Sequence, residues 1–239
     1  MENENVDNKK NIISTLVVLV LVILAIGSYF VFGKNKTDGP VNNDVASVAI
    51  VNGTVISRAT YDTQLANNLA SYKAQGIDVT DETKLSQIKT QVLDNLIGDE
   101  LLNQGVMAAG IKITAEEVEK QFQVILTQEG GADGLQAALV QNNLSEEQLR
   151  ENISKQLAVQ KYLLQNIDTK SITVSDIEVA QFYANLVQSQ AGGDATTPIP
   201  DLNEISDQIK QQIISEKQQT LVVDFIASLR AKATVTTNI

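Results

Sequence analysis

An uncharged apolar run near the start of the chain constrains the fold more than any other feature of the sequence. The 22 residues from Ile12 to Gly33 carry no charge, and two lysines lie close to the run on each side. As a helix, this run is about 33 Å long, which is enough to cross the hydrocarbon core of a bilayer. The sequence therefore predicts a transmembrane helix over residues 12–33, preceded by a short tail over residues 1–11.

A cleaved secretory signal is the alternative interpretation of the same run. The small residues Ala25 and Gly27, followed by Ser28, would suit a signal peptidase. An uncleaved signal anchor is favoured, because the apolar run continues past this point to Phe32. The lysines are equal in number on the two sides, so charge leaves the orientation undecided. Since most of the chain follows the helix, we expect a single-pass protein of the cell membrane with its C-terminal domain outside the cytoplasm.

A folded domain over residues 45–239 is predicted to follow a polar linker over residues 34–44. It opens with β-prone residues on both sides of Asn52 and Gly53, a pair that favours a tight hairpin because both residues tolerate positive φ. The closing segment, residues 233–239, alternates like a strand, and we expect it to pair with the hairpin. The apolar spacing between these ends is helical, so the expected fold class is mainly α with a small sheet.

Capping residues and glycines mark the expected helices. Helices are predicted over residues 58–75 and 81–109, because Gly76 and Gly110 follow them. Four more helices open with the spacing of a capping box, at Thr114/Glu117, Ser145/Gln148, Ser175/Glu178 and Asp201/Glu204. On one side of the helix after Ser145 we expect Leu149, Ile153, Leu157 and Leu164, and the helix after Ser175 contains the apolar residues Ile177, Phe182 and Leu186.

The composition excludes most catalytic chemistry. The chain has no His and no Cys, so it has no Ser-His-Asp or Cys-His nucleophile, no zinc site of the His/Cys type and no disulfide. Its 18 basic and 29 acidic residues give a net charge of −11, which disfavours nucleic acid as a partner. We predict no catalytic residue, no cofactor and no metal ion, and we interpret the acidic pairs as capping or solvated groups, at Asp99-Glu100, Glu116-Glu117 and Glu146-Glu147.

Five segments follow one another in a recognisable order, over residues 45–62, 92–122, 142–163, 172–186 and 205–235. Their order and spacing resemble those of the SurA N-terminal domain family of extracytoplasmic chaperones and foldases. In relatives of this kind, a parvulin-type peptidyl-prolyl isomerase domain commonly precedes the last long helix. Here only residues 189–200 fill that position, and twelve residues cannot form a domain with its own core. The resemblance therefore implies a chaperone domain without the isomerase.

The resemblance and the uncharged run over residues 12–33 together imply a membrane-anchored holdase that works without ATP on unfolded or newly translocated secreted polypeptides. Its expected contacts are these polypeptides and, through residues 12–33, the membrane near the translocon exit. A scaffold for one dedicated envelope protein is the main alternative, and an isomerase with unrecognised residues is disfavoured. Peptide-binding residues stay unassigned, because core packing is the expected role of the six apolar positions most open to clients, namely Met107, Phe122, Leu126, Tyr162, Phe182 and Tyr183.

Overall fold

The structure, a computed structural model, describes residues 47–191 and 200–239. The expected tail, transmembrane helix and linker lie outside the described residues, and so does most of the loop at 189–200. Within the described ranges, no helix is both long and apolar enough to cross a bilayer.

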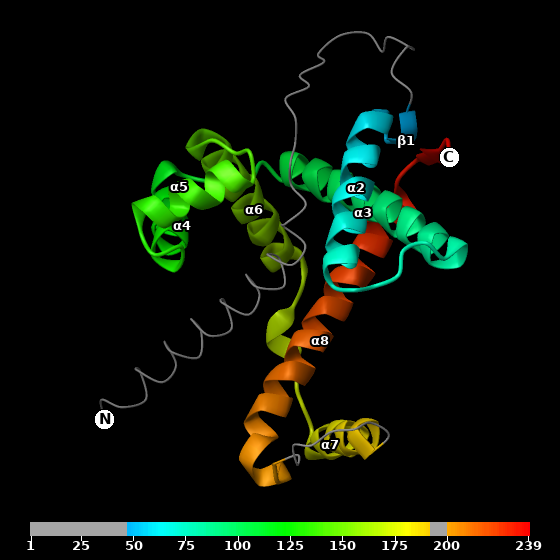
Figure 1. Ribbon diagram of the computed structural model, residues 1–239, viewed down its shortest axis with the longest axis vertical. Helices are drawn as coiled ribbons and strands as arrows, with labels where there is room; N and C mark the ends of the chain where they lie inside the picture. The colour runs from blue at the N-terminus through cyan, green and yellow to red at the C-terminus, as the bar shows by residue number, and fades with distance from the viewer. Residues whose placement is uncertain (1–46, 192–199) are drawn as a thin grey trace. The chain divides into compact units, whose positions relative to one another are not determined.

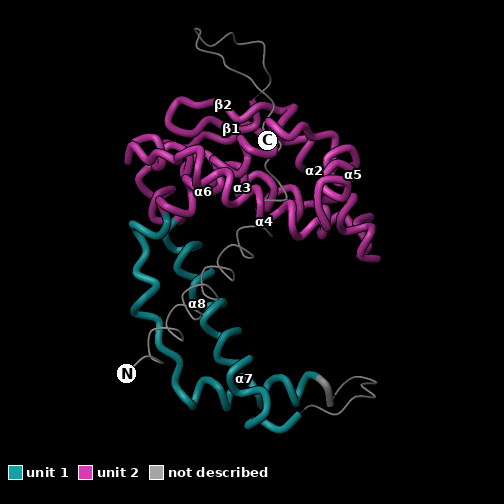
Figure 2. The backbone as a smooth tube through the Cα atoms, turned by 90° about the vertical axis from the view of Figure 1, so that its left-hand side faces the viewer, with its two compact units in different colours: residues 1–25, 163–225 teal, residues 26–162, 226–239 magenta. Residues whose placement is uncertain are grey.

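The described part of the chain is mainly helical, with one small sheet, as the sequence predicts (Figure 1). Its elements, in chain order, are β1 (Ser47–Val51), β2 (Thr54–Ser57), α2 (Arg58–Ala74), α3 (Glu82–Ala108), α4 (Ala115–Gln128), α5 (Ala132–Gln141), α6 (Glu146–Asn166), the short 3₁₀ helix η1 (Thr169–Ser171), α7 (Asp176–Ala191), α8 (Leu202–Lys232) and β3 (Val235–Thr237). They divide into two compact units whose boundaries fall within α6 and α8 (Figure 2).

The three strands form one antiparallel sheet in the order β2-β1-β3. Asn52 and Gly53 have φ angles of 51° and 89°, the left-handed conformation that a tight hairpin turn requires. Strand β3 pairs with β1 so that Val235 lies opposite Val51 and Thr237 lies opposite Ala49. The predicted return of the last segment to the hairpin is confirmed.

Asn52 links the hairpin turn to the start of β3. Its backbone N–H donates to the carbonyl of Thr234 (2.8 Å), and its side-chain oxygen accepts from the N–H of Thr234 (2.8 Å). Its amide nitrogen donates to Oε1 of Gln104 on α3 (2.8 Å), and Nε2 of Gln104 donates to the carbonyl of Val51 (3.0 Å). One turn residue thus connects the hairpin, the last strand and the longest helix of this unit.

The sheet packs with α2 and α3 around the larger core. Val48, Val51 and Ile97 are fully buried there. The end of α8 comes close to α3 at Gly98, where an added Cβ would lie 3.3 Å from Cγ2 of Ile226. This core therefore brings together β1, at the start of the described chain, and the end of α8, close to its last residues.

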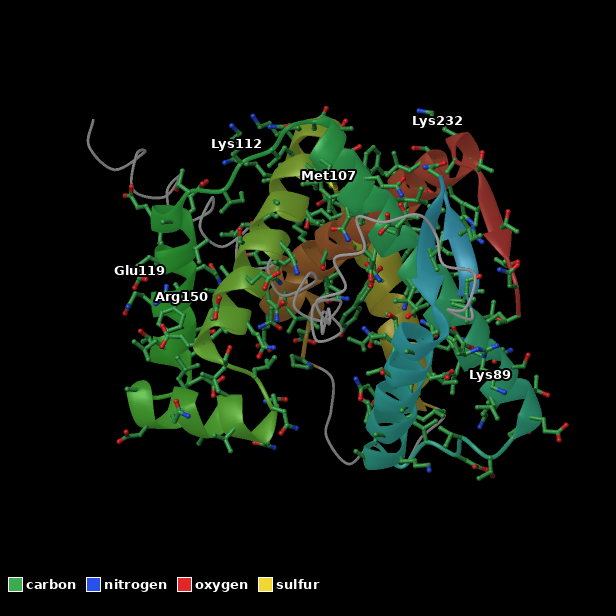
Figure 3. All side chains as sticks on the ribbon, turned by 90° about the horizontal axis from the view of Figure 1, so that it is seen from above. Lys89, Met107, Lys112, Glu119, Arg150 and Lys232 are labelled. Carbon is green, nitrogen blue, oxygen red and sulfur yellow. The ribbon has the colours of Figure 1, made fainter. Side chains whose placement is uncertain are left out.

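Helices α4, α5 and α6 surround a second core in the same unit, formed around Phe122, Leu135 and Ile153. The guanidinium carbon of Arg150 lies 3.8 Å from the centroid of the Phe122 ring, and its Nη1 lies 2.6 Å from Oε2 of Glu119 (Figure 3). Arg150 therefore combines a cation–π contact with an ion pair on the surface of this core.

Three of the four predicted capping boxes are present with both of their hydrogen bonds, at Thr114/Glu117, Ser145/Gln148 and Ser175/Glu178. Helix α5 was not predicted from the sequence, because it begins after Gly131 without a side-chain cap. Leu164 lies on the same side of α6 as Leu157, as the spacing predicts, but its side chain is 48% exposed. The core around Phe122 covers α6 only as far as Leu157, and beyond it the buried side of α6 shifts to Tyr162 and Leu163.

Replacement of Asn52 tests the link between the turn and β3. We expect Asn52→Ala to lower the free energy of unfolding by about 1–2 kcal/mol, because it removes two side-chain hydrogen bonds and disfavours the positive φ. Asn52→Gly is the matched control, since it removes the same hydrogen bonds but tolerates this φ, and it should cost less. Urea unfolding of the three proteins measures both effects, and equal stability of Asn52→Ala and the unaltered chain would contradict the assigned link.

Candidate polypeptide-binding surface

Five of the six apolar positions considered for client contact pack into cores, as expected. Phe122 and Tyr162 are buried. The other three are partly buried against the smaller cores, namely Leu126, Phe182 and Tyr183. Met107 differs, because it is 80% exposed near the end of α3 (Figure 3). The ring of Tyr162 covers α3 at Gly105, and Met107, two residues further along the helix, points to another side.

Helix α7 presents an apolar stripe to solvent. The residues recur at positions i, i+3, i+7 and i+10, which places them on one side of the helix, and they are Ile177, Ala180, Ala184 and Val187. All four are exposed, Ile177 by 70% and Val187 by 41%. We call these four residues the outer face of α7. From the sequence, Ile177 was grouped with Phe182 and Leu186. A helical wheel of all apolar positions would have separated the exposed side of the helix, with Ile177, from the side that packs against α8, with Phe182.

The opposite side of α7 packs against α8. Val179 is buried there with Ile209 and Ile213 of α8, and Phe182 packs against the same cluster. The hydroxyl of Tyr183 donates to the carbonyl of Pro200 (3.0 Å). Because this inner side already supplies the packing of the helix, the outer face is free of any role in the core of its own unit.

An ion pair fixes the start of α7 to α8. Lys217 pairs with Glu178, and its Nζ also donates to the carbonyl of Thr173 (2.7 Å). The hydrogen bond from Lys217, followed by the hydrogen bonds from Ser175, lowers the pKa of Glu178 to about 2. Glu178 is therefore ionised at every physiological pH, and this charge is compensated within the unit.

Amide side chains divide into two groups. Gln64 and Gln218 are buried, and Asn142 donates to the carbonyl of Ala138 in its own helix (2.8 Å). Another group is exposed along α8, comprising Gln208, Gln211, Gln212 and Gln219. Amide side chains can hydrogen-bond a peptide backbone, and only the exposed ones are placed to do so.

The acidic pairs have structural partners. Glu117 caps α4 and pairs with Lys161 (3.0 Å), and Glu146 pairs with Arg150 (2.9 Å). Glu100 accepts a hydrogen bond from Nε2 of Gln104 (2.6 Å). Across residues 47–191 and 200–239, no cluster of three or more acidic residues could hold a metal ion.

Asp99 has the most unusual electrostatics of the described residues. Burial raises the pKa of its carboxyl to about 7, and no charged neighbour contributes to the shift. A carboxyl that titrates near neutrality is typical of acid–base sites, but such sites also need a second group with a defined role. Because burial is the sole cause, the raised pKa of Asp99 reflects the packing around α3 and does not indicate an acid–base site.

The described fold, a helical domain whose sheet is completed by a distant strand, is similar to that of a solved structure. That structure is described as one of two structurally related SurA-like chaperones of Campylobacter jejuni, the virulence factor PEB4 and the periplasmic protein Cj1289. It matches with a TM-score of 0.52 and 15% identity, over 81% of this chain and 99% of that one.

The chain belongs to the SurA-like N-terminal domain family, whose profile matches residues 4–163. Among curated proteins, the chaperone SurA of Pseudomonas putida is 29% identical over 139 residues, which is 58% of this chain. The match spans about a third (32%) of the length of that relative. The family match supports a chaperone role, and the solved structure shows the fold alone.

Replacement of Asp99 tests the effect of its burial. The folded state keeps this proton up to about pH 7, whereas the unfolded chain loses it near pH 4, so this group lowers stability as pH rises through that window. Asp99→Asn should remove this pH dependence and raise the melting temperature at about pH 8, with little effect near pH 4. Circular dichroism at several pH values measures it, with the exposed residue Glu82 of the same helix as the control (Glu82→Gln). A melting temperature of Asp99→Asn below that of the unaltered chain at pH 8 would contradict the assignment.

Proposed function

We propose that this protein is a membrane-anchored chaperone that holds unfolded or newly translocated polypeptides outside the cytoplasm without using ATP. Membership of the SurA-like N-terminal domain family over residues 4–163 is the observation that carries the proposal. The curated relative is itself named a chaperone.

The exposed surface suits weak and unselective binding. Exposed apolar side chains lie on several helices, including Met107 on α3, Ile177 on α7 and Val223 on α8. Scattered contacts of this kind each contribute little, so that a client can be released without an energy source. The net charge of −11 would keep a complex with an unfolded client dispersed in solution.

The anchor in this proposal is the uncharged run over residues 12–33. It would place the folded domain next to the translocon, where clients emerge unfolded. The domain would then lie outside the cytoplasm, and its local concentration at the membrane would compensate for weak binding of each client segment.

Isomerase activity is not part of the proposal. Helix α7 ends at Ala191 and α8 begins at Leu202, so the segment between them is too short for a domain with its own core. The chain also lacks the His and Cys side chains that commonly line a parvulin site.

Suppression of aggregation tests the proposal directly. The full chain, at a fixed low detergent concentration in every arm, is mixed with an unrelated protein diluted from denaturant, and light scattering is followed. We expect suppression at a near-stoichiometric ratio, without ATP, and no acceleration of cis-to-trans isomerisation of a proline peptide by the same sample. The matched control is an equal mass of serum albumin, which measures non-specific crowding.

The alternatives give different results. A scaffold for one dedicated partner would leave aggregation unchanged, and clear acceleration of isomerisation would contradict the interpretation of residues 189–200. Either result would overturn the proposal.

A further inference from the structure

We propose that the outer face of α7 binds unfolded segments that combine apolar side chains with lysine or arginine, so that the chaperone prefers positively charged clients. The inference rests on the proposed chaperone function and names the class of client that this surface fits. It depends on the apolar stripe of α7 and on the charge of the unit that carries it.

The unit formed by α7 and the first part of α8 has a strong excess of negative charge. Residues 163–191 and 200–225 contain three lysines and eight acidic residues. Lys217 pairs with Glu178, and Nζ of Lys210 lies 4.0 Å from Asp176. Most of the carboxylates therefore keep their charge uncompensated, and the potential over this unit is negative.

The residues of α7 that border the outer face are acidic or neutral. Helix α7 contains no lysine or arginine. Asp176 precedes Ile177 at one end of the stripe, and its side chain is fully exposed (100%). Gln181 and Gln188, which follow the stripe along one side, are exposed and neutral. An apolar strip on a helix without lysine or arginine, in a unit with a net negative charge, is complementary to a segment that carries apolar and basic side chains.

The rest of the described chain offers no equivalent surface. Residues 47–114 and 226–239 contain seven basic and seven acidic residues, so that this region is neutral. Residues 115–162 are acidic, with four basic and eight acidic residues, but their exposed apolar residues Val124 and Val140 lie on different helices. The apolar stripe of α7 therefore lies in the unit with the excess of negative charge, most of which is carried by residues before α7 and on or just before α8.

A second copy of the chain fits the outer face less well than a basic client. Two copies joined through α7 would bring two units of the same negative charge together, and like charges across an interface disfavour association. The negative charge of the unit therefore favours a basic client over a second copy of the chain on the outer face of α7.

Binding of three designed peptides tests the proposed preference. The peptides are unfolded, of equal length and with the same number of Leu and Ala residues, and they carry Lys, Glu or Gln at all other positions. Fluorescence anisotropy with the full chain should give about tenfold tighter binding of the Lys peptide than of the Glu peptide at low salt. The difference should shrink at about 0.5 M salt, because salt screens exposed charges.

Two pairs of substitutions locate the site. Ile177→Ser with Val187→Ser should weaken binding of the Lys peptide about fivefold, because both apolar contacts are lost. Val124→Ser with Val140→Ser is the matched control, since it makes the same kind of change at residues of similar exposure, and it should have no effect. Circular dichroism melting curves of both variants should match that of the unaltered chain, since all four residues are exposed.

Equal affinity for the Lys and Glu peptides would overturn the inference, and so would equal effects of the two pairs of substitutions. If the chain still suppresses aggregation in that case, the chaperone function stands and only the assigned client class is wrong. If the chain binds no peptide and suppresses no aggregation, both proposals fail. Sedimentation velocity provides a further check, because a dimer that the Ile177→Ser/Val187→Ser variant dissociates would show a second copy on this face and overturn the inference.

Discussion

The fold depends on the antiparallel pairing of β1 with β3. This pairing places Val235 opposite Val51, and the hydrogen bonds between Asn52 and Thr234 extend it into the hairpin turn. The same end of the chain is held to α3 by Arg230, whose Nη1 lies 2.6 Å from Asp94. Without this pairing, Val48 and Val51 would lose part of the cover that buries them completely, and the end of α8 would be left with contacts such as the ion pair of Arg230 and the packing near Gly98.

The elements that could be predicted from sequence are those with a local cause. Asn52 and Gly53 specify their turn because few residues tolerate positive φ, and each confirmed capping box is made by side chains three residues apart. Helix α5 escaped prediction because nothing local marks its start apart from a glycine. The exposure of Leu164 and the burial of Asp99 depend on which helices lie nearby, and periodicity does not contain that information.

The candidate surface was predictable only in part. The spacing of Ile177, Ala180, Ala184 and Val187 is present in the sequence, but their exposure follows from the packing of the other side of α7 on α8. Which carboxylates of this unit are paired depends on tertiary contacts in the same way. Lys217 is distant in sequence from Glu178, and Lys210 is distant from Asp176. Only the fold brings these charges together and leaves most of the other carboxylates of the unit without an ion pair.

The distance along the chain between β1 and β3 has a consequence for the order in which this protein folds. Ile50 pairs with Thr236, so β1 and β2 emerge from the ribosome long before the strand that completes their sheet. During that interval the hairpin has an open edge, and open edges are sites at which chains associate wrongly. A contact of such long range also slows folding. Vectorial synthesis therefore leaves the open edge of β1 unpaired for most of the synthesis of this domain.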